Sequence, residues 1–84
     1  MDDREFIEGR IREFLADALD APSHGIGLDQ NLFEKAGLDS IGAVMIFVEI
    51  SIEFGIPEPD DENELREVNT ISKLIDFTIE NREV

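Results

Sequence analysis

Ser40 is the residue of this chain whose type and position most favour chemistry. It lies in the segment 37–41 (GLDSI), at the junction between a loop and an apolar stretch, residues 41–54, that holds only two charged residues. Gly37 frees the backbone for a tight turn. A serine at a helix start can accept a hydrogen bond from one of the unpaired backbone N–H groups there. We therefore predict that Ser40 is the N-cap of a helix and that its hydroxyl is presented for modification.

The surroundings of Ser40 do not predict a catalytic nucleophile. A serine nucleophile needs a general base within hydrogen-bond reach, and no histidine or cysteine lies near Ser40 in the sequence. His24 is the only histidine, and it lies sixteen residues earlier in a glycine-flanked loop. We interpret His24 as a solvated loop residue. The chain is therefore predicted not to be an enzyme.

Composition restricts the partners and the compartment. The 84 residues include 21 acidic and 7 basic side chains, for a net charge of −14. This charge disfavours nucleic acids and anionic membranes and favours proteins with basic patches, although solubility alone would also explain it. The acidic start, Asp2, Asp3 and Glu5, does not resemble a secretory signal, and no apolar run reaches membrane-spanning length. We expect a soluble, cytoplasmic monomer.

The sequence has no cysteine, which excludes disulfides, zinc–cysteine sites and a thiol nucleophile in the polypeptide. The acidic run 60–64 (DDENE) lacks the ligand spacing and central glycine of a calcium-binding EF-hand loop. We interpret this run as the entry to a helix. No metal site is predicted.

Apolar periodicity predicts an all-α fold in one domain, residues 1–84: a four-helix bundle of three main helices and one short helix. The main helices are expected at 2–19, 40–54 and 70–81, and the short helix at 63–68. A long loop, 20–39, connects the first two helices and contains a helical turn at 31–35. No strand-like alternation or internal repeat is present.

The predicted core comes from the three main helices, the short helix and the long loop. The short helix would present Leu65 and Val68 inward, and the last helix would bury Ile71, Leu74, Ile75 and Thr78. The first helix has one apolar stripe, and the long loop has four apolar residues that would hold it to the core. The helix at 40–54 is apolar nearly all round, with a core stripe and a second face that is either a contact surface or covered by the long loop. The members are Phe6, Ile7, Ile11, Phe14, Leu15, Ala18 and Leu19 in the first stripe; Leu28, Leu32, Phe33 and Leu38 in the loop; Ile46, Phe47, Ile50 and Phe54 in the second stripe; and Val44, Met45, Val48 and Ile52 on the second face.

At this point the residues resemble the acyl carrier protein family, which includes peptidyl and aminoacyl carriers. The resemblance rests on length, acidity, helix order and the segments 32–34 (LFE) and 37–41 (GLDSI). The Asp-Ser-Ile motif is short and would be weak alone. Three further features make the resemblance strong. They are the spacing of the motif to Phe54, the connector with Pro57 and Pro59, and the segment 69–71 (NTI) that starts the last helix. It extends from the first helix to Phe77.

The resemblance implies that Ser40 carries 4′-phosphopantetheine, which a separate phosphopantetheinyl transferase moves from coenzyme A. It implies that Asp39 assists recognition by that transferase and that Ile41 lines the root of the arm. Acyl or aminoacyl groups would be carried as thioesters on the terminal thiol of the arm. A chain without cysteine can carry thioesters only on an imported thiol, and a helix N-terminus suits an attached phosphate.

Several residues depart from the pattern of carriers in fatty acid synthesis. Met45 and Ile52 occupy positions that are often acidic in that family, and Ser51 is neutral. Gly42 replaces a polar residue, and Glu58 stands where an apolar residue is common. We therefore expect a specialised lipid or polyketide-type pathway with activating ligases or synthases as partners. The predicted partner surface consists of Val44, Met45, Val48, Glu49, Ile52 and Glu53.

Two other functions stay open. The first is an aminoacyl, D-alanyl or peptidyl carrier that an adenylating ligase loads. The second is an unmodified acidic interaction module in which Ser40 only caps its helix.

Overall fold

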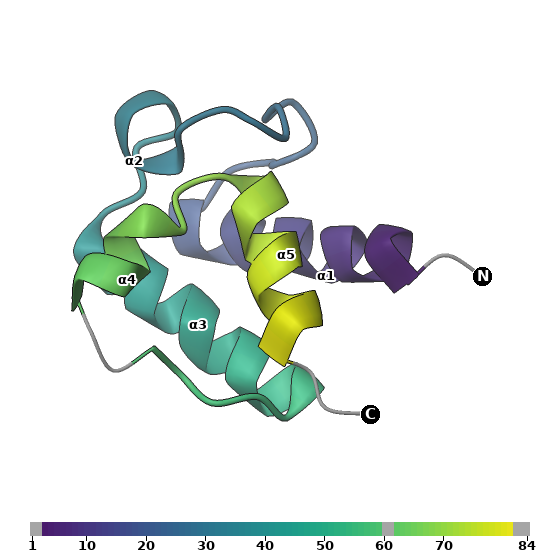
Figure 1. The fold of residues 1–84 in the computed structure, drawn as a ribbon. Coiled ribbons are helices and arrows are strands. Elements are labelled where there is room, and N and C mark those ends of the chain that lie inside the picture. The colour runs from purple at the N-terminus through teal and green to yellow at the C-terminus, as the bar shows by residue number, and fades with distance from the viewer. Residues whose placement is uncertain (1–2, 60–61, 82–84) are drawn as a thin grey trace.

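The computed structural model describes residues 3–59 and 62–81, and within them the chain forms five helices and no strand (Figure 1). The helices are α1 (Asp3–Leu19), α2 (Leu32–Lys35), α3 (Ser40–Phe54), α4 (Glu62–Glu67) and α5 (Ile71–Asn81). The predicted all-α fold is confirmed, with the expected helical turn of the long loop forming α2. The expected start of the first helix at Asp2 lies outside the described residues. No helix in the described part is long and apolar enough to cross a membrane.

Three long helices build the core. α1 packs against both α3 and α5, and Figure 1 shows α5 crossing in front of α1. Phe47 of α3 and Phe77 of α5 meet edge to face, with ring centroids 5.2 Å apart. The buried apolar side chains of these helices are Ile7, Ile11, Phe14 and Leu15 on α1, Ala43, Ile46, Phe47 and Ile50 on α3, and Ile71, Leu74 and Ile75 on α5.

One residue of the expected core stripe on α1 lies at the surface. Phe6 is 53% exposed, so its assignment to the core was wrong. It lies at the edge of the α1 stripe, where it packs edge-on against Phe54 with ring centroids 6.3 Å apart. Phe54 is itself only partly buried. This aromatic pair therefore closes the side of the bundle instead of filling its centre.

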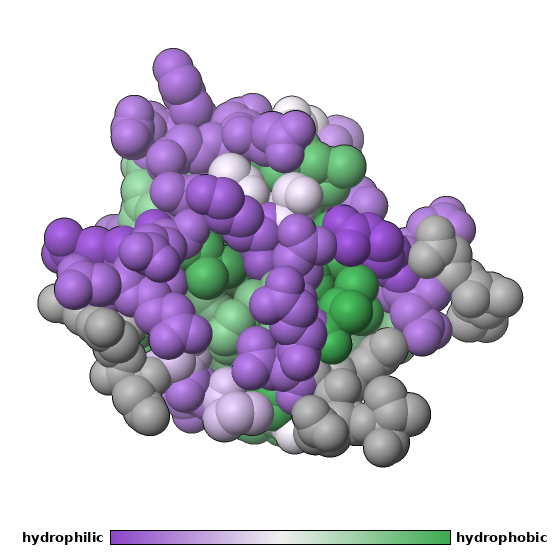
Figure 2. Space-filling model, viewed as in Figure 1, coloured by the Kyte–Doolittle hydropathy of each residue, from purple (hydrophilic) through white to green (hydrophobic). Residues whose placement is uncertain are grey.

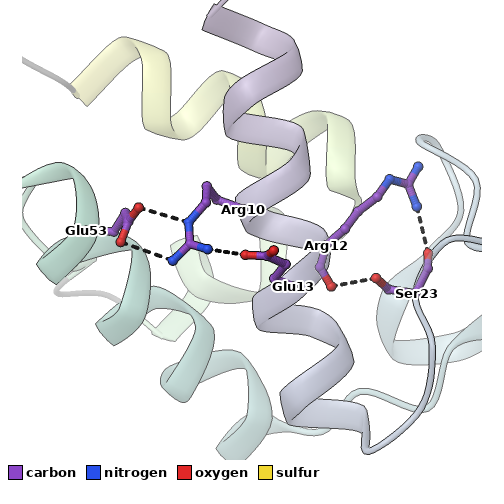
Figure 3. A network of polar contacts seen from close by, with 5 residues as sticks. All are labelled: Arg10, Arg12, Glu13, Ser23 and Glu53. Atoms are coloured by element: carbon purple, nitrogen blue, oxygen red, sulfur yellow. Dashed lines mark hydrogen bonds and ion pairs between the residues drawn. The ribbon is translucent and has the colours of Figure 1, made fainter.

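Arg12 holds the start of the long loop against α1 (Figure 3). Its guanidinium Nη1 donates to the carbonyls of Ser23 at 2.7 Å and Ile26 at 2.9 Å. Its Nε donates to Glu8 at 2.9 Å. In return, the Ser23 hydroxyl donates to the Arg12 carbonyl at 2.5 Å. A polar side chain of α1 therefore anchors the loop, a role that we had expected only from apolar residues of the loop.

The remainder of the loop is fixed partly by apolar burial and partly by the backbone. Leu32 and Leu38 are buried, as predicted. Leu28 is 43% exposed, so the prediction that its side chain anchors the loop was wrong. Its carbonyl instead accepts from the Ser72 N–H at 2.9 Å, and the Leu32 N–H donates to the Asn69 carbonyl at 2.8 Å. The start of α5 therefore fixes the loop that leads to α3.

Candidate functional site at the start of α3

Ser40 is the first residue of α3, and Asp39 is its N-cap. Asp39 has an extended backbone, φ −111° and ψ 179°, and its carboxylate Oδ1 accepts from the Gly42 N–H at 2.7 Å. The prediction that Ser40 caps the helix was therefore wrong. Both residue types cap well, but a charged acceptor makes the stronger hydrogen bond. The exposed hydroxyl of Ser40 has no hydrogen-bond partner among the described residues.

Two glycines allow this helix start. Gly37 has a φ of +80°, in the left-handed region that favours glycine. Gly42 is buried, and a Cβ there would lie 2.9 Å from Leu38 Cδ1 and 3.2 Å from the capping oxygen of Asp39. The absence of a side chain at Gly42 lets the first turn of α3 lie directly on Leu38. From the sequence, Gly42 was noted only as a replacement for a polar residue of the family pattern. Its role in packing was not predicted.

A surface groove of about 420 Å³ lies beside Ser40. Its walls come from α2 and its N-cap, from the start of α3, from the last turn of α4 and from the segment that joins α4 to α5. Phe33 provides its apolar part, and Glu34 and Asp39 provide carboxylates. Among the described residues that line it, Arg66 is the only positively charged one. Neither Arg66 nor Asn69, which also lines the groove, was among the predicted site residues. One feature of the sequence could have pointed to Arg66, because it is the only basic residue between Lys35 and Lys73.

The residues present fit a phosphate-linked group on Ser40. The hydroxyl is exposed in the first turn of a fifteen-residue helix, where unpaired backbone N–H groups and the helix dipole favour an anion. The adjacent groove offers room and one guanidinium. The described residues contain no group of three or more histidine, cysteine or acidic side chains suited to a metal ion. His24 is exposed in the loop, as predicted.

The outward face of α3 presents apolar side chains. Ile41 is 73% exposed, Met45 52% and Ile52 78%, with Val44 close to half exposed and Val48 partly buried. The long loop does not cover these residues, so that alternative is wrong. Glu49 is exposed on the same helix. On the face shown in Figure 2, hydrophobic patches likewise reach the surface between hydrophilic side chains.

Glu53, the second acidic residue predicted to contact partners, already has a partner in the molecule. Arg10 of α1 donates to both of its carboxylate oxygens, at 2.9 Å and 3.2 Å (Figure 3). The hydrogen bond to Glu53 is the largest cause of the raised pKa of Arg10. Arg10 also contacts Glu13 and lies over the ring of Phe14, 5.1 Å from its centroid. Of the two acids on α3, only Glu49 therefore has no such link to a described residue.

The family of the chain is decided by a match over most of its length. Residues 9–78 match the family model described as "Phosphopantetheine attachment site". The chain belongs to this family. Members of this family carry a 4′-phosphopantetheine group at an attachment site. The matched residues include those that line the groove and those at the start of α3.

Proteins similar to this chain include two groups of carriers. The chain is 35% identical to a D-alanyl carrier protein of Lacticaseibacillus rhamnosus over 71 residues, which are 84% of this chain and 88% of that protein. It is 34% identical to an acyl carrier protein of Buchnera aphidicola subsp. Acyrthosiphon pisum over 71 residues, 84% of this chain and 86% of that protein. An acyl carrier protein of Rubrobacter xylanophilus is 29% identical over 80 residues, which cover 95% of this chain and 96% of that protein. The two groups are thus almost equally similar to this chain.

Proposed function

We propose that this carrier-family protein holds acyl intermediates as thioesters on a 4′-phosphopantetheine group attached to Ser40 and delivers them to partner enzymes. The observation that carries the proposal is the hydroxyl of Ser40, exposed and without an internal hydrogen bond in the first turn of α3. Asp39 takes over the capping of the helix, so modification of Ser40 costs the helix no cap. When bound, the group supplies the thiol that this cysteine-free chain lacks.

The chain itself has two tasks in the attachment. It presents the Ser40 oxygen, and its helix start stabilises the negative charge of the phosphodiester that forms there. A phosphopantetheinyl transferase performs the reaction. The serine oxygen forms a P–O bond to the pantetheine-bearing phosphorus of coenzyme A, the diphosphate P–O bond breaks, adenosine 3′,5′-bisphosphate leaves, and the serine proton goes to a base of the transferase. Asp39 and Ile41, which flank Ser40, belong to the surface that the transferase contacts. No catalytic role is assigned to the carrier.

The outward face of α3 is the proposed docking surface for partner enzymes. Exposed contiguous apolar side chains on a small protein often mark an interaction site. Because Glu53 is linked to Arg10, the contribution of charge to this face comes mainly from Glu49. The partners are therefore expected to present apolar surface with few basic residues, as in a specialised lipid or polyketide-type pathway. The members of this surface are Val44, Met45, Val48, Glu49, Ile52 and, at its edge, Glu53.

An aminoacyl or D-alanyl carrier loaded by an adenylating ligase is the second candidate. It is supported by the 35% identity to the D-alanyl carrier protein of Lacticaseibacillus rhamnosus. Incubation of the modified protein with acyl-activating and with aminoacyl-activating enzymes, followed by intact-mass measurement, separates the two. The mass of the loaded product identifies the class of cargo.

Attachment is tested by incubating the protein with coenzyme A and a promiscuous phosphopantetheinyl transferase. Intact protein should gain the mass of one phosphopantetheine group, and Ser40→Ala should gain none. Ser23 and Ser51 are internal controls, because their hydroxyls donate to the carbonyls of Arg12 and Ile56. No gain for the unaltered protein would favour an unmodified interaction module. A gain that persists in Ser40→Ala would reject the site.

A further inference from the structure

Arg66 has an unusual position for a basic residue in this acidic chain. It lies in the last turn of α4 and lines the groove of about 420 Å³ that contains Ser40. It also lines a second, larger hollow of about 830 Å³ between α4 and α5. Its side chain is exposed and has no hydrogen bond or ion pair with any described residue. A guanidinium is thus available at the wall of the groove.

The arginines of α1 are all engaged. Arg4 is paired with Asp76, Arg10 with Glu53, and Arg12 with Glu8. Lys35 is the other lysine or arginine whose side chain has no partner among the described residues, but it does not line the groove. In a chain of net charge −14, carboxylates are available almost everywhere. Arg66 is therefore distinguished both by lacking a carboxylate partner and by facing the groove beside Ser40.

We infer that Arg66 binds the phosphodiester that links the pantetheine arm to Ser40; this inference rests on the proposed function. The described lining of the groove holds the carboxylates of Glu34 and Asp39 and a single cation, Arg66. Modification adds another negative charge next to these carboxylates, and the guanidinium adds a full positive charge to the partial positive charge of the helix start. Arginine suits this role because its planar fork donates two parallel hydrogen bonds to phosphate oxygens.

The contact also sets the direction in which the arm leaves Ser40. A phosphodiester held by Arg66 places the first part of the arm in the groove toward α4. The apolar outward face of α3 then stays free for a partner enzyme. Because Arg66 is exposed, the ion pair is screened by water and weak, so a partner can draw the arm out of the groove.

The test uses the modified protein in its unaltered form and as the variants Arg66→Gln and Lys73→Gln. Lys73 is a matched control, because it lines the larger hollow but not the groove of Ser40. Intact mass first establishes that each protein carries one group on Ser40. The ³¹P NMR resonance of the phosphodiester is then recorded at low salt and at about 1 M salt, where the screening length falls to about 3 Å. In parallel, the Arg66 Nε–H resonance is compared before and after modification.

We expect the ³¹P resonance of Arg66→Gln to be shifted from that of the unaltered protein, while Lys73→Gln stays close to it. High salt should move the unaltered protein toward the position of Arg66→Gln. The Arg66 Nε–H resonance, which requires no variant, should shift on modification. Superimposable ³¹P resonances, together with an unchanged Nε–H resonance, would overturn the inference and leave the proposed function intact. Absence of the mass gain on Ser40 would overturn both.

Discussion

Arg10 on α1 and Glu53 on α3 are joined by two hydrogen bonds, Nε to Oε2 at 2.9 Å and Nη2 to Oε1 at 3.2 Å. They lie 43 positions apart in the sequence. The pair connects the middle of α1 to the last turn of α3, beside the aromatic contact of Phe6 with Phe54. It also engages one of the two carboxylates of the docking surface proposed for α3 and leaves Glu49 as the other.

The first prediction concerns this pair. Arg10→Gln and Glu53→Gln should each lower the melting temperature slightly, and the double variant should lose less than the sum, because each single change breaks the same link. The effect should shrink as salt is added, since the two side chains remain partly exposed. Thermal melts of the four proteins at two ionic strengths measure this. Strictly additive losses would show that the pair contributes no coupling.

The second prediction separates the two neighbours at the start of α3. Asp39→Ala should lower the free energy of unfolding by about 0.5–2 kcal/mol, because it removes the N-cap. Ser40→Ala should change it by no more than about 0.5 kcal/mol, as for an exposed side chain without a partner. Urea unfolding measures both, with Asp39→Asn as the control that keeps a capping acceptor. A larger loss in Ser40→Ala than in Asp39→Ala would contradict the assignment of the cap.

The third prediction concerns the anchor of the long loop. Arg12→Met keeps much of the apolar stem but removes the donors to the carbonyls of Ser23 and Ile26. We expect a loss of about 1–3 kcal/mol in the free energy of unfolding, because part-buried acceptors lose their partners. Amide exchange should become faster in residues 21–27. Arg4→Met is the matched control, since the Arg4–Asp76 pair is half exposed and should cost less. Equal losses would mean that Arg12 has no special role.

The fourth prediction tests the outward face of α3. Ile52→Gln should leave the free energy of unfolding within about 0.5 kcal/mol, because the side chain is 78% exposed. The same change should raise the KM of an activating or synthase enzyme for the carrier if that enzyme docks on this face. Leu28→Gln, an exposed leucine of the loop, is the control and should leave the KM unchanged. Equal KM values for all three proteins would remove Ile52 from the proposed surface.

The fifth prediction follows from the net charge of −14. Like charges on so small a body repel one another, and about 0.1 M salt screens interactions beyond about 10 Å. The melting temperature should therefore rise with added salt or divalent cations. Melts recorded across a salt series, with a neutral osmolyte as the comparison, check this. A melting temperature independent of ionic strength would contradict self-repulsion.

Local sequence patterns determined the helices and the position of Ser40. Apolar periodicity, the proline connector and the glycines predicted the four helical segments and the helical turn within a residue or two of their observed bounds. These patterns predict helices because helix formation depends on the backbone and on residues close in the chain, and both can be read from the sequence. The placement of Ser40 at the junction between the loop and α3 was therefore available before any coordinates.

Tertiary packing decided what the sequence left open. Asp39 and Ser40 are both good capping residues, and the sequence does not say which of them caps. In the structure Asp39 accepts from the Gly42 N–H, which leaves the Ser40 hydroxyl free. The exposure of Phe6 depends on its place at the edge of the bundle. The placing of Arg66 beside Ser40 depends on α4. Each of these relationships except the cap itself joins residues that are distant in the chain, and such contacts follow from how the helices pack, which no local pattern specifies.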